Sequence, residues 1–188
     1  MIWHSVFGIE ADIEALLSPT HLLLAAGMVL MLSGGMRHFW ASRKTGKAQN
    51  FCNSFPFLLS AALTLAVLLF MTQFGQYTEI EAVGRMPANP FYPQALSLTG
   101  IFVFTISLVG LLSILLRRDR LPFGSVTLIL TASVFGLSMM RYGTEIIPAA
   151  LLAGIVGDLW LEMTETRLSR MMGLRIFTFL LPFVFFVL

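Results

Sequence analysis

Two of the three histidines in the chain stand near acidic residues close to its beginning. His4 and His21 flank a segment that contains Glu10 and Glu14. His21 lies two residues after Pro19, and proline is common at the first position of a helix. The positive end of a helix dipole disfavours imidazolium, and a metal ion needs the neutral imidazole. Two imidazoles with a carboxylate suit copper, zinc or iron, so these four residues form a candidate metal site.

The segment between the two histidines predicts how they could approach one another. Within residues 7–17, apolar residues recur at helical spacing, whereas Glu10 and Glu14 fall on the other side. This pattern predicts a short amphipathic helix lying on a membrane surface. Such a helix can fold back and bring His4 toward His21. The competing interpretation is that these side chains are ordinary solvated groups at the membrane surface.

The pair Trp3-His4 followed by Ser18-Pro19-Thr20-His21 resembles the membrane C subunit of the copper membrane monooxygenases, the particulate methane and ammonia monooxygenases. In that family a Trp-His pair ends one helix and a Thr-Pro-x-His-like sequence begins the next. The resemblance spans residues 3–21 and implies that both histidines bind copper, within a larger complex. The family's third ligand, an acidic residue or asparagine four positions before the first histidine, would here precede Met1. An N-terminal truncation, or a start codon assigned too late, would explain its absence.

The composition is that of a membrane protein. Of the 188 residues, 57% are hydrophobic and only 12% are charged, against about 25% charged in a typical soluble domain. The apolar residues occur in runs long enough to cross a bilayer, which needs about 20 residues per helix. We therefore expect an all-α, polytopic transmembrane helix bundle that forms one integral membrane domain over residues 1–188. The single cysteine, Cys52, excludes an internal disulfide and a CxxC motif.

Six apolar runs follow an outer surface segment at residues 1–19. The predicted spans are about 20–40, 54–74, 94–116, 121–140, 146–160 and 176–188. Residues 161–175 are predicted to form an amphipathic connector on the cytoplasmic side. The last run is short: it covers about 20 Å at 1.5 Å per residue, whereas the hydrocarbon core is about 30 Å thick. We expect it either to insert halfway or to belong to a longer chain.

The basic residues predict the orientation. In the six-span arrangement, ten of the twelve lie in connections on one side, and only Arg85 and Arg141 lie on the other. Connections rich in Lys and Arg face the cytoplasm. The pattern therefore predicts a multi-pass protein of the cell (inner, cytoplasmic) membrane with both termini outside. His4 and His21 then lie on the outer face.

One acid lies well inside a predicted span. Asp158 is close to Trp160 and Glu162 at the predicted cytoplasmic interface. Intramembrane acids are functional candidates by default. Here we interpret Asp158 as a side chain that snorkels to the surface or is paired with Arg167 or Arg170.

The same helix carries a stripe of small residues. Ala149, Ala153 and Gly157 recur every four positions. Small residues at this spacing let two helix backbones approach closely in a membrane. We therefore expect this stripe to face a neighbouring helix.

Two functions of different classes remain open. One is a copper-site membrane protein similar to a copper monooxygenase C subunit, in which the metal would activate dioxygen. The alternative is a non-catalytic accessory or assembly subunit that packs against other membrane subunits or further copies of itself. The abundant phenylalanine, 17 residues, suits burial against lipid or a partner. A transporter is less favoured because charges inside the spans are scarce, and the dispersed basic residues do not indicate nucleic-acid binding.

Overall fold

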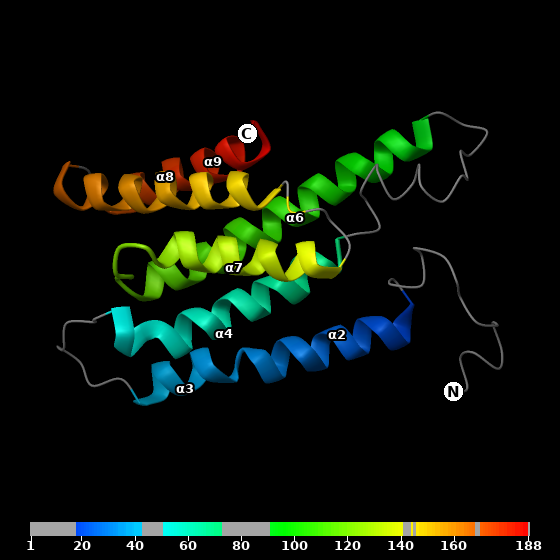
Figure 1. Ribbon diagram of the computed structural model, residues 1–188, viewed down its shortest axis with the longest axis horizontal. Coiled ribbons are helices and arrows are strands. Elements are labelled where there is room, and N and C mark those ends of the chain that lie inside the picture. Colours follow the sequence, from blue (N-terminus) through cyan, green and yellow to red (C-terminus); the bar gives the residue numbers. More distant parts are fainter. Residues whose placement is uncertain are drawn as a thin grey trace.

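The computed structural model describes residues 18–42, 51–72, 91–140, 144, 146–167 and 170–187. The predicted surface helix at residues 7–17 lies outside this part of the chain. The described part contains helices and no strands, and Figure 1 shows the helices running roughly alongside one another. They are α2 (Pro19–Leu32), α3 (Gly34–Ser42), α4 (Phe51–Phe70), α6 (Phe91–Arg118), α7 (Ser125–Met140), α8 (Ile146–Arg167) and α9 (Arg170–Val187).

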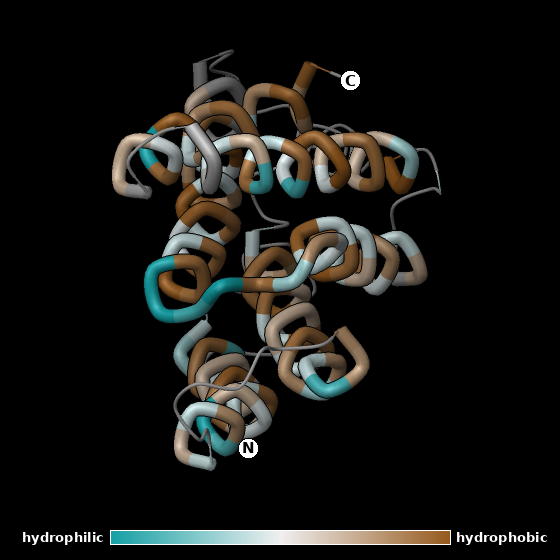
Figure 2. The backbone as a smooth tube through the Cα atoms, turned by 90° about the vertical axis from the view of Figure 1, so that its left-hand side faces the viewer, coloured by the Kyte–Doolittle hydropathy of each residue, from teal (hydrophilic) through white to brown (hydrophobic). Residues whose placement is uncertain are grey.

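The predicted fold class is confirmed: the chain is an all-α bundle of the kind found in membranes. Four stretches among the described residues are long and apolar enough to cross a bilayer, namely Pro19–Ser42, Phe51–Phe70, Leu98–Arg118 and Ile146–Thr164. Two further apolar helices, Ser125–Met139 and Met171–Val187, are shorter. Large apolar side chains also cover much of the surface, and Figure 2 shows hydrophobic residues along most of the helical tube.

Helix α4 is the centre of the bundle. It packs against α2, α3, α6 and α7. Half of the residues in its most apolar 18-residue stretch are buried, compared with 6% in the corresponding stretch of Pro19–Ser42. Its buried face contains small residues, including Ala61 and Ala62, which allow close helix packing. Ser133 of α7 donates a 2.9 Å hydrogen bond to the Ala62 carbonyl oxygen. The chain therefore builds its core around the second apolar run.

A serine from α4 interrupts the first span. The Ser60 hydroxyl donates to the carbonyl of Leu32 and accepts the Met36 amide N–H at 3.2 Å. It therefore stands between two groups that an unbroken helix would join directly, a known cause of helix bending. A Cβ atom on Gly35 would lie 2.8 Å from the Ser60 Cβ atom, so only glycine lets the two backbones come this close. The break separates α2 from α3 in Figure 1.

The predicted surface connector at residues 161–175 is wrong. Most of this stretch is helical, shared between α8 and α9, which pack against each other. The Trp160 indole N–H donates a 3.1 Å hydrogen bond to the Gly173 carbonyl oxygen. A Cβ atom on Gly173 would lie 2.9 Å from the Thr164 Cβ atom. Because glycine permits this close approach, α8 and α9 form a tight hairpin and α9 begins before the apolar run that marked it.

The small-residue stripe on α8 faces α7 and α9, with a shift from the predicted register. Ala153 and Gly157 are buried as expected, whereas Ala149 is only half-buried. The closest approach is at Gly154, where an added Cβ atom would lie 2.5 Å from the Thr127 Cα atom. One face of α8 therefore lies almost in backbone contact with α7.

Candidate functional site

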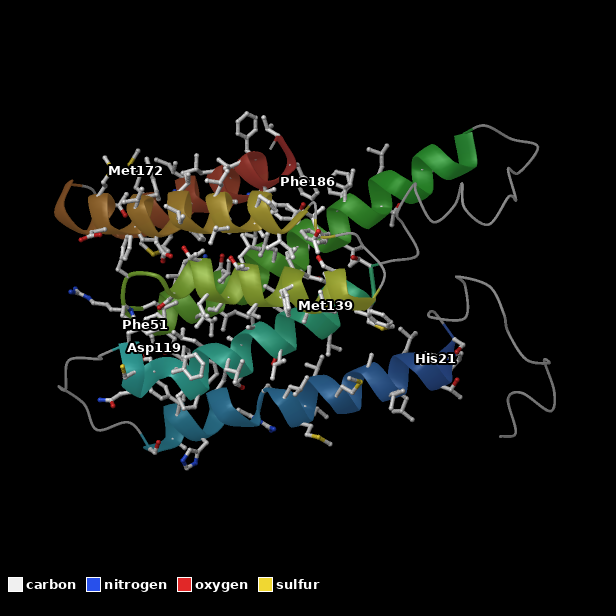
Figure 3. All side chains as sticks on the ribbon, viewed as in Figure 1. His21, Phe51, Asp119, Met139, Met172 and Phe186 are labelled. Carbon is white, nitrogen blue, oxygen red and sulfur yellow. The ribbon has the colours of Figure 1, made fainter. Side chains whose placement is uncertain are left out.

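His21 lies in the first turn of α2, as the sequence predicted. Ser18 is the N-cap residue and has extended backbone angles, but its side chain makes no hydrogen bond to the helix N–H groups. The Ser18 Oγ atom instead lies 2.8 Å from His21 Nδ1 and 3.1 Å from Thr20 Oγ1. The imidazole is therefore held by its own helix cap at one end of the bundle, where Figure 3 labels it.

The Ser18 contact bears on what the His21 ring can do. If Nδ1 carries the proton, it donates to the serine hydroxyl and leaves an unprotonated Nε2. Metal-binding histidines generally have this arrangement, with the second ring nitrogen donating to a nearby oxygen. In the other tautomer the hydroxyl donates to Nδ1 and Nε2 is protonated. His21 can therefore bind a metal ion through Nε2 in one of its two neutral tautomers, the one that is protonated at Nδ1.

The other predicted ligands, His4, Glu10 and Glu14, lie outside the described residues. Among the residues that the structure does describe, no group of three or more His, Cys, Asp or Glu side chains could hold a metal ion. Convergence of the four residues on one metal, and copper as that metal, therefore stay predictions from the sequence.

Asp158 holds the beginning of α7. Its carboxylate accepts N–H groups from Val126 at 3.1 Å and Thr127 at 2.9 Å, and the Thr127 hydroxyl at 2.6 Å. These amides belong to the first turn of α7, where helix N–H groups have no partner within the helix. A side-chain acceptor usually comes from the N-cap residue, but here that residue is Gly124, with φ of +87°. Asp158 therefore caps α7 from the neighbouring helix.

The expectation that Asp158 snorkels to the surface is wrong. The residue is 4% exposed because its carboxylate points into the bundle toward the α7 amides. The side chains of Arg167 and Arg170 lie outside those that the structure describes. Because its carboxylate accepts three hydrogen bonds inside the bundle, Asp158 has a structural role, and a catalytic or ligand-binding role is less favoured.

A second buried acid joins the C-terminal end of α3 to the α6–α7 connection. Asp119 is 2% exposed and accepts a 2.6 Å hydrogen bond from the Trp40 indole N–H of α3. The Arg118 guanidinium lies over the same indole, 4.3 Å from the ring centroid, a favourable cation–π geometry. Figure 3 labels Asp119 at the end of the bundle opposite His21. This cluster was not predicted from the sequence, although an acid among three arginines beside an apolar run is a signal for it.

A pocket of about 400 Å³ opens at the same end, a volume within the range of small-ligand sites. It lies between the α6–α7 connection, the C-terminal half of α8 and the beginning of α9. Its polar lining comes from Asp119, Arg120, Asp158, Glu162 and Thr164, and its apolar lining includes leucine and phenylalanine side chains. It is a second candidate site, distinct from the one at His21.

Comparisons with protein-family models, curated proteins and solved structures find no match. The class of protein that the fold defines is a helical membrane bundle, with one polar site at each end. These two sites are the candidates for its function.

Proposed function

We propose that this chain is an integral membrane subunit that presents His21 as a copper ligand at the outer membrane surface. The observation that carries the proposal is the 2.8 Å contact between Ser18 Oγ and His21 Nδ1, which holds the ring through Nδ1 and leaves Nε2 as the nitrogen that would bind the metal. His4 and a carboxylate from Glu10, Glu14 or a partner chain would complete the site. The resemblance of residues 3–21 to the copper monooxygenase C subunit supports copper as the metal.

The arrangement of the helices supports the outward orientation. The C-terminal end of α3, the α6–α7 connection and the facing ends of α8 and α9 lie together at the left of Figure 1, and α2 begins at the opposite end. These are the helix ends that border ten of the twelve basic residues. With the basic end in the cytoplasm, His21 faces outward in the cell membrane.

Metal analysis of the full chain tests the copper proposal. We expect about one copper per chain after loading in lipid nanodiscs, with nitrogen hyperfine structure in the Cu(II) resonance spectrum. His21→Ala should abolish both signals, and Ser18→Ala should weaken copper binding about tenfold or more, as the loss of ring-orienting partners does elsewhere. His38→Ala is the matched control, because His38 is an exposed histidine on α3. Equal copper in the wild type and the His21→Ala variant would contradict the proposal.

The alternative is a non-catalytic accessory subunit whose first span binds a partner helix. It is favoured by α2, where none of the 14 residues is buried. Leu23 and Met31 are 76% and 79% exposed. A photo-crosslinking residue at Leu23 should then capture a protein in native membranes, whereas one at Phe102 of α6, also exposed at 64%, should capture lipid. Lipid adducts alone at both positions would exclude this alternative for α2.

A further inference from the structure

Two oppositely charged side chains that line the pocket beside Asp119 make no contact that stabilises the described part of the fold. The Arg120 guanidinium and the Glu162 carboxylate both line it and both belong to exposed residues. Within the described part of the chain, neither side chain has an ion pair or hydrogen bond. The other two acids have structural partners, since Asp158 caps α7 and Asp119 accepts the Trp40 indole N–H. The charged groups without a partner in the described part of the fold, and therefore available to a ligand, are one cation and one anion.

The position of the pocket points to a lipid. It lies at the end of the apolar helices, where Trp40 and Trp160 mark the level of a membrane interface. Its remaining lining is apolar and includes Leu121, Leu161 and Phe123, which is 57% exposed. A ligand that fits has opposite charges in its polar part and an apolar body that lies along the helices. A zwitterionic phospholipid has this chemistry.

We propose that this pocket binds the phosphoethanolamine headgroup of a phospholipid. The Arg120 guanidinium suits the phosphate, because its N–H groups match phosphate oxygens in pairs. The Glu162 carboxylate suits the ammonium group, which donates up to three hydrogen bonds. An anionic lipid would satisfy Arg120 and place its negative headgroup near Glu162. A choline lipid would offer a positive charge with no N–H donor.

Native mass spectrometry of the purified full chain, titrated with defined lipids, tests the proposal. We expect phosphatidylethanolamine to bind about tenfold more tightly than phosphatidylglycerol or phosphatidylcholine of the same acyl chains, the size of one charge-assisted hydrogen bond. Glu162→Gln should remove the preference over phosphatidylglycerol. Arg120→Gln should weaken both lipids. Arg117→Gln, an exposed arginine at the same end that does not line the pocket, should bind as the wild type does.

Several outcomes would overturn the proposal. Equal affinity of the wild type for the three lipids would do so, as would an unchanged preference in Glu162→Gln. Soluble phosphoethanolamine that binds as tightly as the lipid would refute the membrane source of the headgroup. Both substituted residues are exposed, so circular dichroism should show wild-type helix content and thereby validate the comparison.

Discussion

At the scale of single residues, the acid inside the bundle illustrates how a membrane protein uses a charge. A first turn of helix in an apolar setting leaves N–H groups unsatisfied, and each such group is costly. Gly124 has no side chain with which to satisfy them. Asp158, 32 or 31 positions further along the chain, accepts the N–H groups of Val126 and Thr127. The fold therefore gives its least apolar intramembrane residue a structural task.

Replacing Asp158 should destabilise the protein. Asp158→Ala leaves two buried N–H donors without acceptors, at about 1–3 kcal/mol each. Asp158→Asn keeps one acceptor oxygen and should have an intermediate effect, as should Thr127→Val. Glu162→Gln removes the same charge one turn further on from an exposed side chain, so it is the control and should leave stability unchanged. Thermal unfolding in detergent, followed by tryptophan fluorescence, measures these effects, and equal stability of Asp158→Ala and Glu162→Gln would contradict the capping role.

At the scale of helices, the tightest contact is between α7 and α8. An added methyl at Gly154 would lie 2.5 Å from the Thr127 Cα atom, which is backbone and cannot move aside. Gly154→Ala should therefore push the helices apart and cost about 1–3 kcal/mol or more. Gly110 of α6 has nothing within 4 Å of such a methyl, so Gly110→Ala should be neutral or stabilise by about 0.5–1 kcal/mol. The melting temperature should fall in Gly154→Ala and should stay the same or rise in Gly110→Ala. An unchanged melting temperature in Gly154→Ala would refute the close approach.

Replacing Gly157 on the same face of α8 with leucine should disrupt the packing of the helices. A Cβ atom there would lie 3.1–3.2 Å from side chains of Val126, Leu181 and Phe177. A full leucine has no space among them, so the variant should fail to assemble as a monodisperse protein on size-exclusion chromatography. Wild-type elution and stability of Gly157→Leu would show that the neighbouring side chains can move to accommodate leucine, and would contradict this prediction.

At the scale of the whole molecule, orientation is the property that most directly affects both proposed sites. A reporter active only in the cytoplasm should give signal when fused after Lys47, and one active only outside should give signal after Glu81. The basic asymmetry supplies the physical reason. The reverse pattern would place His21 inside the cell and the lipid pocket in the outer leaflet.

The sequence was sufficient to predict the helical bundle, because apolar runs are long and separated by polar residues. It predicted one span over about residues 20–40, where the structure has two helices, Pro19–Leu32 and Gly34–Ser42, divided at Ser33. It could not show that division, because Ser60 causes it from another helix. The predictions for Asp158 and for residues 161–175 were wrong for the same reason. Asp158 is held by Thr127 of another helix, and residues 161–175 are shaped by the contact between α8 and α9, so both depend on tertiary packing. The local hydrophobic pattern therefore predicted where the helices lie, whereas contacts between residues far apart in the sequence determine how the helices pack.

The capping of α7 by Asp158 has a consequence for the order of biogenesis. The ribosome completes α7 before α8, so α7 enters the translocation machinery with its first-turn amides uncapped. Asp158 then arrives as a charged group that is costly to place in the apolar part of a bilayer without partners. Each helix supplies what the other lacks, since the carboxylate accepts the Val126 and Thr127 amides. We therefore expect α7 and α8 to pass into lipid together, as a hairpin, and a ribosome stalled before Asp158 to leave α7 accessible to water.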